Sequence, residues 1–117
     1  MAKIIHGLRE AILLIAGQKN NYSEEMIRLA KDLGIDRNII FAGWLNKAEL
    51  RLAYMASDVI TLPSIYPEPF GMIALEAMAC KKPVIGTCFG GTKEIIKDGE
   101  TGYVINPNDA DSFADKI

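Results

Sequence analysis

The sequence predicts an α/β fold with a doubly wound, Rossmann-like parallel sheet of about five strands and flanking helices. Two observations lead to this prediction. Short, largely unbroken apolar runs alternate with longer amphipathic stretches, which is typical of parallel strands covered on both faces and connected by helices. Glycine or proline stands at or just after the end of most of these runs, where the chain has to turn.

The strands are expected at residues 12–16, 39–42, 59–62, 84–87 and 103–105. Ligands of doubly wound sheets bind beyond the carboxyl ends of the strands. The loops that follow the first four strands are therefore the places where a functional site is expected.

Helices are expected in the intervals between these strands. Ser23 precedes two glutamates and can N-cap a helix that ends at Gly34, and Asn46 can cap the next one. Pro69 can open a third helix, because proline suits the first helical turn. The other helices are expected at residues 2–10, at residues 92–96 and from Asp109 onward.

Composition narrows the class of protein. The 117 residues contain no linker or repeat, so we expect a single domain over residues 1–117. A net charge of −2 gives no basic footprint for nucleic acid. No apolar run approaches the ~20 residues of a membrane span, and the apolar run 11–16 is too short for a signal peptide. Cys80 and Cys88 fit no metal spacing; free thiols are favoured over a disulfide.

The loop after the third strand is the most informative segment for chemistry. Pro67 and Pro69 bracket Glu68 and restrict the backbone on both sides of it. Such stiffening suits a carboxylate that has to point in one direction. The alternative is an ordinary strand-to-helix turn, in which Glu68 simply lies near a helix N-terminus.

A second carboxylate, Glu76, follows eight residues later, roughly 12 Å along a helix axis. Between the two glutamates, the backbone amides of Phe70, Gly71, Met72 and Ile73 would form a helix N-terminus that can hold phosphate. A carboxylate, an anion cradle and a second carboxylate suit a ligand with hydroxyls on either side of a diphosphate.

Glu68, the Pro-Phe-Gly after it and Glu76 together resemble the Glu-x7-Glu signature of retaining glycosyltransferases of the GT-B fold, in group 1 (family 4). Further blocks of the chain resemble the same family in the same order, at residues 14–17, 40–44, 56–59, 74–85, 90–94 and 98–103. The resemblance covers nearly the whole chain from about residue 13. It implies half of a GT-B fold, the domain that binds a nucleotide-sugar donor for retaining transfer of a hexosyl group.

The resemblance also implies roles for individual residues. Glu68 would lie against the donor sugar and is the candidate catalytic residue, while Glu76 would bind the ribose hydroxyls. The backbone at residues 70–73 would hold the sugar and the diphosphate. No cofactor and no metal are expected, because the helix dipole and basic side chains would neutralise the diphosphate.

Two loops complete the implied donor site. Gly43 and Trp44 would lie beside the nucleobase, although Trp44 could equally be a core aromatic. Gly90 and Gly91 would form a tight loop near the sugar pocket, and a simple turn is the alternative. The base and sugar stay open, with UDP and GDP donors both compatible.

The resemblance implies a nucleoside-diphosphate sugar and an acceptor as partners. The acceptor, a glycan, a lipid or a small molecule, would be held by an N-terminal domain outside these residues. No nucleic acid and no membrane contact are expected, and the implied location is cytoplasmic, with the inner membrane surface open through the other domain.

Two departures from the family pattern stand out. Lys81 replaces the usual glycine before Lys-Pro, so the preceding helix would lose its left-handed stop. The strand and the basic loop that open the family's domain precede the first residue here. We therefore expect an incomplete donor-binding half that transfers no sugar alone and tends to self-associate.

The competing reading is a non-catalytic, flavodoxin-like binding or regulatory module. It would need an aspartate cluster at a strand end or a Gly-x-Gly-x-x-Gly turn, and residues 17–21 do not provide that turn. A stand-alone protein-interaction fold has no apolar stripe to favour it.

Overall fold

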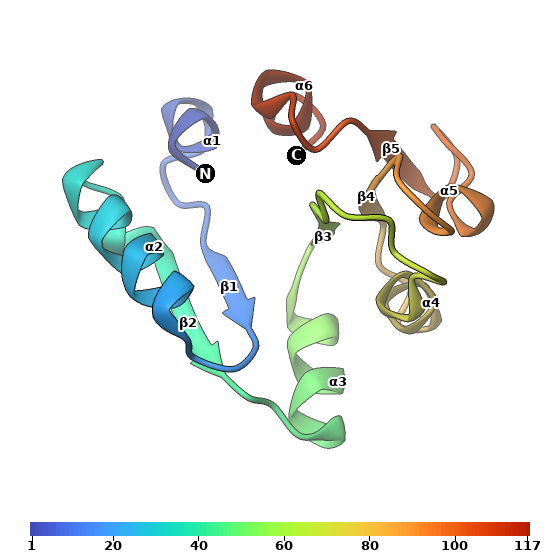
Figure 1. The fold of residues 1–117 in the computed structure, drawn as a ribbon, viewed down its shortest axis with the longest axis horizontal. Helices are drawn as coiled ribbons and strands as arrows, with labels where there is room; N and C mark the ends of the chain where they lie inside the picture. Colours follow the sequence, from blue (N-terminus) through green and yellow to red (C-terminus); the bar gives the residue numbers. More distant parts are fainter. The chain divides into compact units, whose positions relative to one another are not determined.

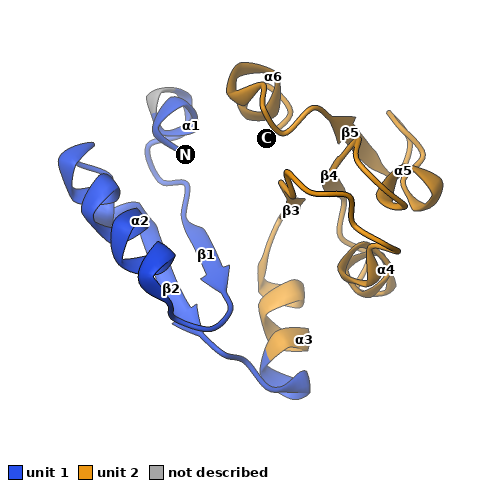
Figure 2. Ribbon diagram, in the orientation of Figure 1, with its two compact units in different colours: residues 1–49 blue, residues 50–117 orange. Residues whose placement is uncertain are grey.

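The computed structural model describes residues 1–5 and 7–117. Figure 1 shows the order of helices and strands along the chain. The chain divides into two compact units, residues 1–49 and residues 50–117 (Figure 2). Among the described residues, no helix is long and apolar enough to cross a membrane.

The first unit is built on two parallel strands. Its elements are α1 (Ala2–Gly7), β1 (Leu13–Ala16), α2 (Asn21–Asp32), the 3-10 helix η1 (Asp36–Asn38) and β2 (Ile39–Gly43). Leu14 of β1 is the register partner of Ile40 of β2. These two side chains are 38% and 50% exposed, so the expectation that both strands are covered on both faces is wrong here.

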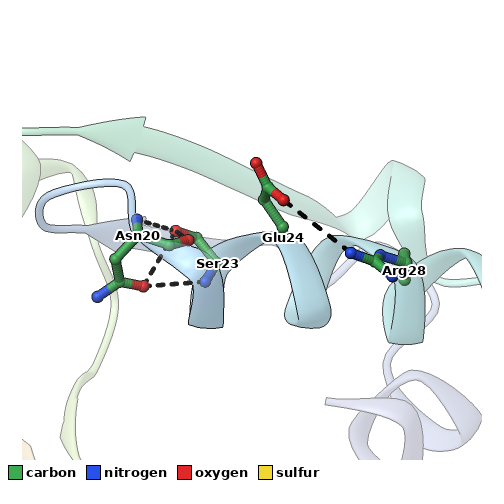
Figure 3. A network of polar contacts seen from close by, with 4 residues as sticks. All are labelled: Asn20, Ser23, Glu24 and Arg28. Atoms are coloured by element: carbon green, nitrogen blue, oxygen red, sulfur yellow. Dashed lines mark hydrogen bonds and ion pairs between the residues drawn. The ribbon is translucent and has the colours of Figure 1, made fainter.

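The N-cap of helix α2 lies three residues before its predicted position. Asn20, not Ser23, is the N-cap: the Ser23 amide donates to Asn20 Oδ1 (3.1 Å), and the Asn20 amide donates to Ser23 Oγ (2.7 Å; Figure 3). This reciprocal capping box satisfies two amides at once, which a cap at Ser23 could not do. The predicted end at Gly34 is confirmed, since Gly34 has φ 65° and Ile35 N–H donates to the Ala30 carbonyl (2.9 Å).

The second unit is built on three parallel strands in the order β3-β4-β5. After α3 (Lys47–Ala56), whose first residues belong to the first unit, come β3 (Ile60–Leu62), α4 (Met72–Ala79), β4 (Val84–Thr87), α5 (Thr92–Ile95), β5 (Gly102–Ile105) and α6 (Ala110–Ala114). All four residues of β4 are buried. The core of this unit consists of Tyr54, Leu62, Ala74, Ala77, Val84 and Ile96.

One predicted helix cap, Asn46, is confirmed, and the helix predicted to start at Asp109 begins with that residue as its N-cap. Asn46 Oδ1 accepts hydrogen bonds from the amides of Ala48 (2.9 Å) and Glu49 (3.1 Å) at the start of α3. Asp109 Oδ1 accepts one from Ser112 N–H (3.0 Å) at the start of α6. Both cysteines, Cys80 and Cys88, are free thiols.

The five predicted strands are all present and parallel, but they form two sheets rather than one. One sheet has the order β1-β2 and the other the order β3-β4-β5.

Helix α4 ends in a left-handed residue that is not glycine. Lys81 has φ 59°, and its amide donates to the Met78 carbonyl (2.8 Å) while Lys82 N–H donates to Ala77 (3.0 Å). The expectation that Lys81 removes the left-handed stop is therefore wrong, because Lys81 adopts that conformation itself. The cost of the conformation is about 1–2 kcal/mol for a residue with a side chain.

Candidate functional site

The loop between β3 and α4 carries the two predicted glutamates, and α4 begins later than expected. Gly71 is its N-cap with φ 74° and ψ 42°. No right-handed helix can pass through this left-handed residue, so the predicted start at Pro69 is wrong. Glu76 consequently lies about 6 Å, or roughly one turn, into α4 rather than two turns.

Glu68 is held by backbone contacts rather than by a helix end. It pairs with Gly90 in an isolated parallel bridge, and Gly91 N–H donates to the Glu68 carbonyl (2.8 Å). Ser64 Oγ donates to Glu68 Oε2 at 3.3 Å, a long and therefore weak hydrogen bond. The half-buried Glu68 side chain thus keeps most of its acceptor capacity.

The Gly90–Gly91 loop lies directly against this backbone. At Gly90 (φ 76°), a Cβ would clash with the backbone oxygen of Glu68 and lie 2.5 Å from its nitrogen. At Gly91, a Cβ would lie 2.8 Å from the Pro69 carbonyl oxygen. The loop is therefore more than a simple turn, since only glycine permits its close approach to Glu68.

At the start of α4, near Glu68 and the Gly90–Gly91 loop, the backbone is the part of the chain that can bind a ligand. The side chains of Phe70, Met72 and Ile73 are exposed, at 59%, 56% and 42%. Ala74 N–H donates to the Gly71 carbonyl (2.9 Å). The amides of Met72 and Ile73 come before any helical carbonyl that could accept from them, so they are available to an anion.

Glu76 has a partner that the sequence did not predict. Tyr54 Oη, from α3, donates to Glu76 Oε2 at 2.9 Å. Burial raises the pKa of Tyr54 well above its ordinary value, and the hydrogen bond to Glu76 and the Glu76 charge raise it further. The signal available in the sequence was a tyrosine within an expected helix, because a buried tyrosine hydroxyl needs a hydrogen-bond partner.

Gly43 and Trp44 belong to the first unit. Gly43 (φ 73°) ends β2, its carbonyl accepts from Gly17 N–H (2.9 Å), and it borders a hollow of about 240 Å³ above the start of α2. Lys19 and Asn20 also line this hollow. Trp44 is 75% exposed, which excludes the alternative of a core aromatic.

A larger hollow of about 660 Å³ lies at the amino ends of the strands of the second sheet, away from the carboxyl ends where the predicted site residues lie. Its lining includes Val59, Pro83 and Gly102, which stand at the amino ends of β3, β4 and β5. It contains none of the predicted site residues. Because ligands of this fold class bind at the carboxyl ends, its size does not make it the better candidate.

Thr92, directly after the glycine loop, has a fully buried hydroxyl. Thr92 and Thr87 are both 0% exposed. Thr87 Oγ1 accepts from Phe89 N–H (3.1 Å), whereas Thr92 Oγ1 has no hydrogen-bond partner in the part of the chain that the structure describes. A Cβ on Gly71 would lie 3.1 Å from this hydroxyl, so Thr92 packs beneath the N-cap of α4.

We expect Thr92→Val to raise the free energy of unfolding by about 1 kcal/mol, because it removes an unsatisfied polar atom and keeps the shape. The matched control, Thr87→Val, should lower the same quantity by about 1–3 kcal/mol, because it leaves Phe89 N–H unpaired. Urea denaturation of the complete protein measures both. Equal losses in the two variants would show that Thr92 Oγ1 does have a partner.

The predicted site residues of the second unit lie close together at one end of its sheet. Beyond the carboxyl ends of β3 and β4, the second unit gathers one carboxylate, a glycine loop and a helix N-terminus, with a second carboxylate on the same helix. This arrangement is typical of the strand ends at which Rossmann-like domains bind their ligands.

The chain belongs to the family of group 1 glycosyl transferases, whose model matches residues 2–117. It is 40% identical over 116 residues to an uncharacterized glycosyltransferase of Methanocaldococcus jannaschii, covering 97% of this chain and 28% of that protein. It is 35% identical over 94 residues to a D-inositol 3-phosphate glycosyltransferase of Mycolicibacterium smegmatis, covering 80% of this chain and 21% of that protein. The chain thus spans well under a third of these relatives.

Solved structures agree with this assignment. The C-terminal domain of a group 1 family protein, LpcC of Francisella tularensis, is 34% identical with a TM-score of 0.86, covering 98% of this chain and 62% of that one. Anabaena HepE in complex with UDP and glucose is 26% identical with a TM-score of 0.84, covering 97% of this chain and 32% of that one. The chain therefore has the Rossmann-like fold of a C-terminal GT-B domain.

Proposed function

We propose that residues 1–117 form the donor-binding domain of a retaining, family 4 hexosyltransferase. In this proposal the domain binds a nucleoside-diphosphate sugar beyond the carboxyl ends of its strands and presents it to an acceptor held elsewhere in the complete protein. The observation that carries the proposal is the backbone pairing of Glu68 with Gly90 and Gly91. This pairing brings Glu68 and the Gly90–Gly91 loop, which are about twenty residues apart in the chain, to one place.

The geometry supports different binding groups for the sugar, the diphosphate and the ribose of the ligand. Glu68, with one oxygen weakly engaged by Ser64, can accept hydrogen bonds from the sugar and stabilise positive charge at the reacting carbon. The Met72 and Ile73 amides at the start of α4 suit the diphosphate, which gains negative charge as it leaves. Exposed Glu76 suits the ribose hydroxyls.

The remaining parts of the proposal rest on the family. Gly43 and Trp44 would contact the nucleobase, and Gly90 and Gly91 the sugar. HepE, which is 26% identical to this chain, was crystallised in complex with UDP-glucose. This supports a nucleotide-sugar as the ligand of this domain. We propose a cytoplasmic location, no metal requirement and no cofactor. No observation favours the alternative of a flavodoxin-like regulatory module.

Calorimetric titration of the complete protein with UDP, UDP-glucose, GDP and GDP-mannose tests the proposal. We expect at least one nucleotide-sugar to bind with a dissociation constant of about 1 mM or tighter, equally with and without EDTA. Donor hydrolysis or transfer should accompany binding. Folded protein that binds none of the four at ~10 mM, well above that range, would contradict the proposal.

A further inference from the structure

We propose that Tyr54 is a positioning residue that aims the Glu76 carboxylate at the two ribose hydroxyls of the nucleotide. The inference rests on the proposed function, because it assumes a nucleotide bound at Glu76. It concerns a residue on α3 that lies outside the Glu68–Glu76 segment and joins it through one hydrogen bond.

The contact joins a rigid group to a flexible one. Tyr54 is 6% exposed and packs in the core with Leu62, Ala74 and Ala77, so its ring and hydroxyl have a fixed position. Glu76 is exposed on α4 and would otherwise sample several rotamers. Ordering a glutamate side chain costs up to about 2 kcal/mol of conformational entropy. A bond already present without ligand removes part of that cost from the binding step.

The contact also decides which acceptor sites stay available. An ionised carboxylate offers about four lone-pair sites on its two oxygens. Tyr54 occupies one of them at Oε2 (2.9 Å), so Oε1 and the remaining site on Oε2 can accept from two neighbouring hydroxyls. A tyrosine phenol is protonated at neutral pH and can therefore donate; the raised pKa of Tyr54 extends this to more alkaline pH. This arrangement matches a vicinal diol better than a single hydroxyl.

The inference predicts a change in selectivity. Tyr54→Phe keeps the ring in the core and removes only the hydroxyl. We expect its affinity for UDP to fall by up to about tenfold, because the cost of ordering the Glu76 side chain returns to the binding step. Affinity for 2′-deoxy-UDP should fall less, so the ratio of the two dissociation constants moves toward one. In the Glu76→Ala background, Tyr54→Phe should have no further effect.

Tyr103→Phe is the matched control, because Tyr103 lies on β5 and contacts Lys116 instead of Glu76. It should leave both dissociation constants unchanged. Both ligands are titrated into the same sample, so their ratio does not depend on the fraction of folded protein. If the parent binds UDP and Tyr54→Phe has the parent's ratio, the inference is wrong. If the parent binds none of UDP, UDP-glucose, GDP and GDP-mannose, the proposed function fails and the inference fails with it.

Discussion

Glu68→Gln in the complete protein is expected to lower kcat about 100-fold, with a much smaller change in donor affinity. Glutamine keeps the shape of the side chain and an acceptor oxygen for Ser64 Oγ, so the ground state changes little. The substitution removes the negative charge, which under the proposed function would act chiefly when positive charge develops on the sugar in an oxocarbenium-like transition state. Steady-state kinetics with donor and acceptor measure kcat and KM separately.

The control for this prediction is Glu100→Gln. Glu100 is an exposed turn residue paired with Lys97 (3.8 Å), and it lines the hollow at the amino ends of the strands. The substitution Glu100→Gln should leave kcat unchanged. A Glu68→Gln variant with unchanged kcat and raised KM would make Glu68 a binding group alone.

Glu76→Ala is expected to weaken donor binding by about 1–3 kcal/mol, the range for a lost hydrogen bond to a charged group. The structure adds a second effect, because the buried Tyr54 hydroxyl loses its acceptor. The free energy of unfolding should therefore fall by about 1 kcal/mol as well. An ordinary surface glutamate would change stability by only about ±0.5 kcal/mol.

Glu76→Gln separates these two effects. Its amide oxygen can still accept from Tyr54, so stability should stay near that of the parent while donor affinity falls. Calorimetric titration with UDP and urea denaturation measure the two quantities in each variant. Donor dissociation constants equal to the parent's in both variants would remove Glu76 from the site.

Local sequence signals sufficed for most of the elements. The ends of the strands were predicted to within about one residue, because short apolar runs bounded by glycine or proline leave few alternatives. Asn46, Asp109 and Gly34 were assigned correctly, since capping and left-handed stops depend on residues only a few positions away. The start of α2 was missed because Asn20 and Ser23 can both cap, and only Asn20 forms the reciprocal pair.

Residue type and spacing were enough to predict the α/β class, the strand positions and the glutamate pair. They did not reveal that α4 starts after a left-handed Gly71, that Gly90 lies on Glu68 or that Tyr54 binds Glu76. Each of these features depends on a contact between segments about twenty residues apart in the chain. Gly71 packs on Thr92, the Glu68 backbone meets a loop beyond β4, and the Tyr54 hydroxyl finds its acceptor on another helix. No local propensity encodes such pairings, because burial and packing of the whole unit select them.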